Sequence, residues 1–232
     1  MDQVLPLLFH CSLTGSLAGL QPVPFPLDST MTIVRDSVGG GLTLHSVVQA
    51  DGPLLAAVAA LGPVTNIVAP NLQHWLFIKE WAAAHPDASI WLAGAANGED
   101  LHEKLAEALA GHRGNVRTLA RAGSLGPELA FRLLDGAPLS LNEVLFFHRP
   151  SGTLIASDSF YGGYAADETP TWFARFWFKL TKAGSFRGHR LPVYRTARAV
   201  SHGDPDRLLI GVKEMAETWS CDQIVFAHGT SP

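Results

Sequence analysis

The chain has 232 residues, 47% of them hydrophobic and 16% charged, and its formal net charge at pH 7 is −4. This composition allows a sizeable hydrophobic core, argues against intrinsic disorder, and leads us to expect a single domain over residues 1–232. The weakly negative charge and the lack of a long basic run argue against a nucleic-acid surface, and no apolar run reaches the roughly 18 residues that predict a membrane span.

The N-terminal segment 4–20 is apolar enough to suggest a secretory signal. However, Asp2 precedes it without any Lys or Arg, and His10 interrupts it.

The two cysteines, Cys11 and Cys221, form no Cys-x-x-Cys pair, which argues against a zinc ribbon or a redox motif. We interpret them as small buried hydrophobic residues in a reducing compartment and expect a cytoplasmic protein.

Strands and helices alternate through the first half of the sequence. A hairpin around a glycine-rich turn comes first, and its strands span 31–35 and 42–48. Apolar spacing and breaker residues then predict helices at 53–60, 72–84 and 99–110, and strands at 65–69, 89–92 and 115–119.

The second half has fewer clear signals. From 120 to about 138 the chain is rich in Gly and Leu and predicts no element, after which strands are expected at 143–147, 153–156 and 222–227. Helices are expected at 171–182 and at 205–218, the latter with Asp204 as its N-cap. Strand pairs in both halves with helices between them predict an α/β (α+β) protein with two sheets packed face to face and helices outside, a four-layer αββα sandwich.

Four predicted strands lead into polar side chains that can bind ligands. These are His45, His74, Asp158 and His228. Ligands in α/β proteins bind beyond the carboxyl ends of strands, so these side chains are candidates for one site. A single histidine at a strand end is more often structural, but four such residues together favour a site.

The order of these segments resembles the metallo-β-lactamase superfamily, which includes glyoxalase-II-like hydrolases and lactonases. In that superfamily a hairpin ending in Asp-Thr-Gly precedes a strand and Thr-His-x-His-x-Asp-His, and later strands end in Gly-Asp and His-Gly. Residues 42–46 take the place of the hairpin, 69–75 the place of the motif, Asp158 the strand-end Asp, and His228 the last His. The Pro-Asn-x-x-His segment at 70–74 and Phe-Phe-His-Arg-Pro-Ser at 146–151 more closely resemble a bacterial group of degenerate members.

The resemblance implies a metal centre, but one set of its ligands is replaced. Pro70 and Leu72 align with the first two histidines of the motif and cannot bind metal. His74, Asp158 and His228 remain, and two imidazoles with one carboxylate leave an open position for water. We therefore expect at most one zinc or other divalent ion, with hydrolysis by an activated water as the reaction.

His45 replaces the superfamily's Asp in the hairpin motif. It is a candidate catalytic residue with Asp158, either as a general base or as a hydrogen-bond partner of a ligand. The alternative is a structural histidine bonded to backbone.

Two other functions remain open. The first alternative is a metal-free module that binds a small-molecule ligand or has a regulatory role. A second alternative is an interaction protein. Segment 171–180 carries five aromatic residues, which favour either a cap over the site or a homodimer contact.

Overall fold

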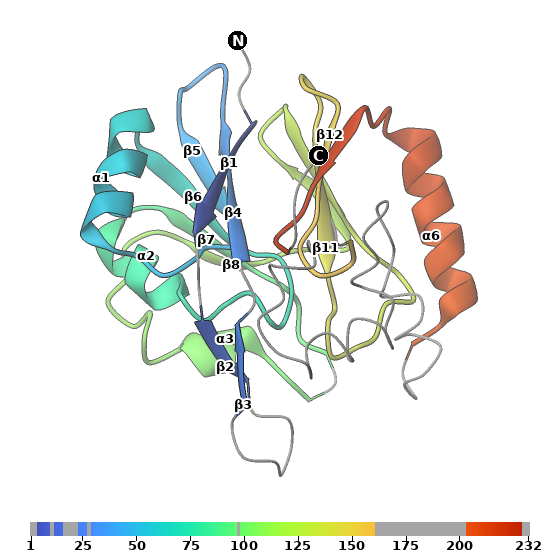
Figure 1. The fold of residues 1–232 in the computed structure, drawn as a ribbon, viewed down its shortest axis with the longest axis horizontal. Helices are drawn as coiled ribbons and strands as arrows, with labels where there is room; N and C mark the ends of the chain where they lie inside the picture. The colour runs from blue at the N-terminus through green and yellow to red at the C-terminus, as the bar shows by residue number, and fades with distance from the viewer. Residues whose placement is uncertain are drawn as a thin grey trace.

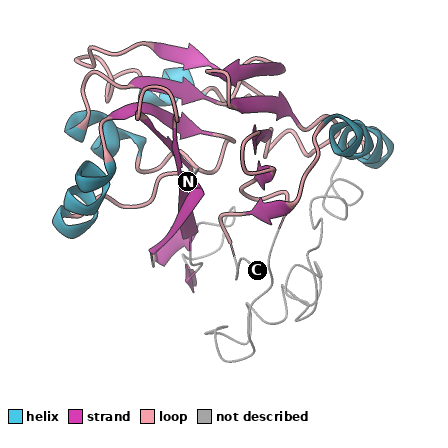
Figure 2. Ribbon diagram, turned by 90° about the horizontal axis from the view of Figure 1, so that it is seen from above, coloured by secondary structure: helices cyan, strands magenta, loops and turns pink. Residues whose placement is uncertain are grey.

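The computed structural model describes residues 4–9, 12–15, 23–26, 29–96, 98–160 and 203–228. Over these residues the chain forms two facing sheets with helices on both outer sides (Figure 1). The view from above shows the same layers, with the sheets between helices on opposite sides (Figure 2). The predicted four-layer αββα sandwich is therefore confirmed.

The first sheet has six strands and its helices lie on one side. In spatial order the strands are β1 (Val4–Phe9), β4 (Ser29–Arg35), β5 (Leu42–His45), β6 (Val64–Ala69), β7 (Ser89–Leu92) and β8 (Val116–Thr118). The helices are α1 (Gly52–Leu61), α2 (Ile78–Ala84) and α3 (Leu101–Leu105). β5 to β8 are parallel, whereas β1 and β4 pair antiparallel.

The second sheet has five strands and is covered by one described helix. In spatial order these strands are β13 (Gln223–Val225), β12 (Thr153–Ile155), β11 (Val144–His148), β10 (Leu129–Leu133) and β9 (Ala122–Leu125). The helix is α6 (Pro205–Thr218). β13 pairs parallel with β12, and the other neighbours are antiparallel. A separate two-stranded sheet joins β2 (Ser12–Gly15) to β3 (Val23–Pro26).

The alternation of apolar side chains along the strands creates three cores. On β6, Ile67 packs on the helix side and Val68 packs between the sheets. On β11, Phe147 packs under α6 and Phe146 packs between the sheets. Since successive side chains of a strand point to opposite faces, both sheets are buried on both faces, and two helical layers are needed to cover them.

α6 begins and ends as the sequence predicts. Pro205 takes the first turn, and the carboxylate of Asp204 accepts hydrogen bonds from the backbone N–H groups of Asp206 and Arg207. The face that carries Leu208 is buried against the second sheet.

Several predicted elements differ from the structure. The helix expected at 99–110 is shorter, because α3 spans only Leu101–Leu105. The helix expected at 72–84 begins only at Ile78, because Asn71 Oδ1 accepts the N–H groups of Gln73 and His74 and holds a turn there. β9 and β10 occupy the stretch for which no element was predicted. Gly123 on β9 faces the Phe131 ring, and a Cβ atom at this position would lie 2.6 Å from a ring carbon. Packing therefore favours glycine here, although glycine weakens the strand pattern in the sequence.

Three further expectations have different outcomes. Cys221 is exposed, so the prediction of a buried side chain is wrong for this residue. Among the described helices, none has the length and hydropathy needed to span a membrane. The aromatic segment 171–180 and Cys11 lie outside the described residues, so the homodimer contact stays a prediction.

The cost of removing a buried side chain tests this packing. We expect Ile90→Ala to lower the free energy of unfolding by roughly 2–5 kcal/mol, because Ile90 is fully buried on β7 and its loss leaves a cavity. Ile210→Ala is the matched control, since this isoleucine on α6 is 58% exposed. Urea unfolding of both variants measures the difference, and equal costs at the two positions would contradict the described core.

Candidate metal centre

Three side chains meet at the edge of the sandwich where strands of both sheets end. His74 lies in the turn after β6, Asp158 follows β12, and His228 follows β13. β6 runs parallel to β5, and β13 runs parallel to β12, so each pair delivers its carboxyl ends to one edge. The ligand atoms of the three residues all lie within 4.8 Å of one another.

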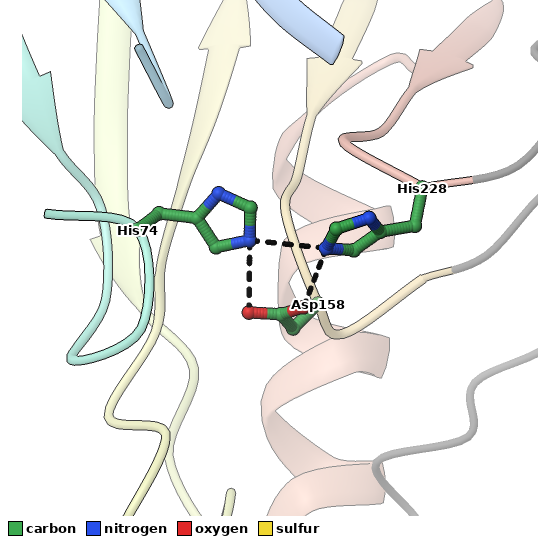
Figure 3. A group of neighbouring side chains, drawn as sticks. All are labelled: His74, Asp158 and His228. Atoms are coloured by element: carbon green, nitrogen blue, oxygen red, sulfur yellow. Dashed lines mark hydrogen bonds and ion pairs between the residues drawn. The ribbon is translucent and has the colours of Figure 1, made fainter. Parts of the chain in front are cut away.

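The three side chains point toward a common centre (Figure 3). His74 Nε2 lies 3.2 Å from Asp158 Oδ2 and 3.2 Å from His228 Nε2, and His228 Nε2 lies 3.2 Å from Asp158 Oδ1. Ligands held tetrahedrally at about 2.0–2.1 Å from a zinc ion are about 3.3–3.4 Å apart. Two imidazole nitrogens and one carboxylate therefore fit a single divalent ion in both chemistry and spacing.

Asp158 is half-buried, with 14% of its side chain exposed, and its surroundings favour the ionised carboxylate. Burial alone would raise the pKa of Asp158, but the charges of His74 and His228 and their hydrogen bonds outweigh this effect and hold the pKa well below its usual range. A carboxylate that remains ionised is available as a metal ligand near neutral pH.

Asn71 and Ser46 form hydrogen bonds that fix the orientation of the candidate ligands Asp158 and His74. Asn71 Nδ2 donates to Asp158 Oδ2 at 2.8 Å, while its Oδ1 accepts the backbone N–H of His74 at 2.9 Å. One buried amide thus fixes both the carboxylate and the turn that carries the imidazole. On the other side of the His74 ring, Nδ1 lies 2.5 Å from Ser46 Oγ. Hydrogen bonds of this kind set the orientation of metal ligands.

Glu143 fixes the backbone around Asp158. Its fully buried carboxylate accepts the N–H groups of Ser157, Asp158 and Ser159, as well as the Ser159 hydroxyl. Burial, and then the nearby charge of Asp158, raise the pKa of Glu143 to about 7, although the hydrogen bonds oppose the shift. The loop that presents Asp158 therefore depends on an acid buried just before β11.

His45 lies beside the site but does not join the three ligands. Its ring is 2% exposed and packs edge-on against Phe146, with 5.1 Å between ring centroids, in the space between the sheets. Neither ring nitrogen has a hydrogen-bond partner among the described residues. Burial, and then the proximity of His74, lower the pKa of His45 to about 3. A ring this weakly basic is poorly matched to general-base catalysis near neutral pH, so the geometry favours an uncharged neighbour of the site.

Comparisons with known proteins identify the architecture. No protein-family model matches the sequence, and no curated protein does either. Among solved structures, DIM-1 metallo-beta-lactamase is 12% identical, with a TM-score of 0.56 over 99% of this chain and 88% of its own. A metallo-beta-lactamase from Pontibacter korlensis is 13% identical, with a TM-score of 0.53 over 98% and 92%. One from Erythrobacter litoralis is 14% identical, with a TM-score of 0.52 over 89% and 80%.

The chain has a metallo-β-lactamase fold. At identities this low the likeness concerns the fold alone. Pro70 and Leu72 are buried and carry no donor for a metal, and Leu72 packs in the core on the helix side of the first sheet.

Sequence reasoning missed three residues that support the ligands. Asn71 was visible only as part of the Pro-Asn-x-x-His segment, and Glu143 only as the first residue of a predicted strand. An acidic residue at the start of an apolar strand was the available signal, because a carboxylate is rarely buried unless it has partners. Ser46 gave no signal, because its role depends on a backbone conformation that the sequence does not reveal.

The buried acid makes stability depend on pH. A carboxyl group whose pKa is raised in the folded state stabilises the fold at low pH, and this contribution is lost as the pH rises through the folded value of about 7. The buried His45, whose pKa is lowered to about 3, acts in the opposite sense, because its contribution to stability is lost as the pH falls below about 6.5. The effect of Glu143 is therefore expected as a difference: the free energy of unfolding of the metal-free wild type, relative to that of Glu143→Gln, should fall between about pH 5 and about pH 8. The fall should amount to a few kcal/mol at most, since one pKa unit corresponds to about 1.4 kcal/mol.

Glu143→Gln is the reference for this difference, because an amide does not titrate while His45 still does. It should also lower stability at about pH 5 by roughly 1–3 kcal/mol, since an amide nitrogen then faces a backbone donor. The exposed Glu107→Gln is the control and should retain the wild-type pH profile. Urea unfolding in the presence of chelator measures both effects, and a wild-type profile in Glu143→Gln would contradict the assignment.

Proposed function

We propose that the chain binds one divalent metal ion at His74, Asp158 and His228 and hydrolyses a small-molecule substrate there. The observation that carries the proposal is the spacing of the three side chains, which point toward one centre. The two Nε2 atoms lie 3.2 Å apart, and each lies 3.2 Å from one of the two oxygens of the Asp158 carboxylate. Zinc is the first candidate, because imidazole and carboxylate ligands suit it and three protein ligands leave one position open.

Asp158 and the two histidines would contribute different properties to the binding of an ion. When bound, such an ion supplies Lewis acidity and lowers the pKa of a coordinated water. Asp158 provides the negative charge that holds a cation, and the two imidazoles supply neutral donors. The His74 and His228 side chains are only 9% and 3% exposed, so protein atoms rather than solvent surround them. This shielding strengthens electrostatic interactions within the site.

A single ion rather than two is the stoichiometry that the residues support. The positions that align with the first two histidines of the superfamily motif hold Pro70 and Leu72, and neither offers a lone pair to a metal. Among the described residues, one group of three or more potential ligands lies close enough to hold an ion. We therefore propose a site without a second Lewis acid for the substrate oxygen.

A metal-free binding or regulatory module is the second candidate. It is favoured by the contacts that the three side chains make with one another, since the Asp158 carboxylate lies within hydrogen-bond distance of both histidines. In this alternative the cluster is a structural link between the two sheets. The affinity of the purified chain for metal decides between the two functions.

Metal content is the first test of the proposal. Untagged protein reconstituted with zinc and desalted should hold one ion per chain by elemental analysis. His228→Ala should lose it, because two remaining ligands cannot hold the ion tightly. His102→Gln on α3 is the control, since this histidine bonds to Thr118 and lies outside the cluster. Two tightly held ions in the wild type would contradict the assignment of a single site. A wild type that holds no ion would favour the metal-free module.

Activity on substrates of two-metal enzymes is the second test. We expect turnover of a chromogenic β-lactam, or of a thioester, to be very weak or absent, because no second Lewis acid is then present to bind the substrate oxygen. Initial rates with and without added zinc measure this. Rapid hydrolysis that a chelator abolishes would show that a second set of ligands exists.

A further inference from the structure

Ser46 has a backbone conformation that a residue with a side chain rarely adopts. Its φ angle is 59°, in the left-handed region where the Cβ atom crowds the following carbonyl oxygen. Asn142 is the other non-glycine residue with positive φ among those described, and asparagine tolerates this region better than serine does. Glycine would adopt the conformation without strain, so serine at this position needs another reason.

The conformation places the Ser46 hydroxyl on a ligand of the proposed metal site. Ser46 follows the last residue of β5, and its N–H donates to the Val68 carbonyl of β6 at 3.1 Å. The side chain is 1% exposed, and its Oγ lies 2.5 Å from His74 Nδ1. The strained turn thus aims a buried hydroxyl at the ring from the side opposite Asp158.

This contact determines how the His74 ring can bind metal. The Nε2 atom faces Asp158 and His228, so it must present a lone pair if an ion binds between them. The proton of the neutral ring then resides on Nδ1, where the Ser46 oxygen accepts it. An imidazole held at both nitrogens keeps one tautomer and one ring plane.

We propose that Ser46 is a positioning residue for the metal centre, retained in a strained conformation because its hydroxyl fixes the orientation and tautomer of His74. This inference rests on the proposed metal site and deepens it. Strained backbone that persists beside a cluster of ligands is a recognised feature of functional sites.

Two substitutions separate the hydroxyl from the strain. Ser46→Ala removes the hydroxyl and keeps a Cβ in the left-handed region. Ser46→Gly removes the hydroxyl and also relieves the steric conflict, so this variant is expected to fold even if Ser46→Ala does not. Thr43→Val is the control, because it removes a buried hydroxyl from β5 that bonds to Asn66 rather than to His74.

Zinc alone is titrated into chelator-stripped protein by calorimetry, and thermal melting of the metal-free proteins is recorded in parallel. We expect both Ser46 variants to bind zinc roughly 10- to 100-fold more weakly than the wild type, the range found when such outer partners are removed. Ser46→Gly should melt at or above the temperature of Ser46→Ala. Thr43→Val should bind zinc like the wild type.

Nuclear magnetic resonance of the ring nitrogens gives a signature that a purely structural role would not produce. In the zinc-loaded wild type the Nδ1 proton of His74 should be protected from exchange with solvent, and in both variants it should exchange faster. Wild-type zinc affinity in both variants would overturn the role of Ser46 and leave the proposed function intact. Weakened binding in Ser46→Gly alone would also overturn it, because backbone conformation would then be the cause. A wild type that binds no zinc would overturn the proposed function and this inference together.

Discussion

The carboxylate of Asp158 is the group on which the site depends. It lies between two imidazoles and the Asn71 amide, and these partners come from the first sheet, through the turn after β6, and from the second sheet, through β13. An ionised carboxylate that is largely withdrawn from solvent, as Asp158 is at the edge where the two sheets meet, needs such partners. The same hydrogen bonds and charges that keep Asp158 ionised therefore also join the two sheets at this edge.

The supporting residues show how the fold sustains that charge. Glu143 accepts hydrogen bonds from three successive backbone N–H groups, and these bonds fix the loop after β12, which forms no helix or strand. Placing a second acid next to Asp158 is unfavourable, and this repulsion contributes to the raised pKa of Glu143. The site is thus built from groups that would each be destabilising if buried alone.

The sequence predicted the layers better than it predicted the site. Alternating apolar residues on β6 and β11 and the capped α6 follow local rules, so the sandwich could be predicted from them. His74, Asp158 and His228 were identifiable because each follows a predicted strand. Asn71, Glu143 and Ser46 were not, because their roles depend on partners that are distant in the chain. His45 was a candidate general base or hydrogen-bond partner of a ligand. Side-chain alternation on β5 directs it into the space between the sheets, beside Phe146, and its part in catalysis stays a prediction.

The parallel pairing of β13 with β12 has a consequence for how the protein folds. His228 approaches His74 across 154 residues of chain, and Asn71 reaches Asp158 across 87. Closing loops of this length is entropically unfavourable, and proteins dominated by such contacts fold slowly. During synthesis the first sheet can form while the last strand is still inside the ribosome. The cluster of His74, Asp158 and His228 comes together only when β13 has emerged and joined the second sheet, so the proposed affinity for metal would be acquired as one of the final steps of folding.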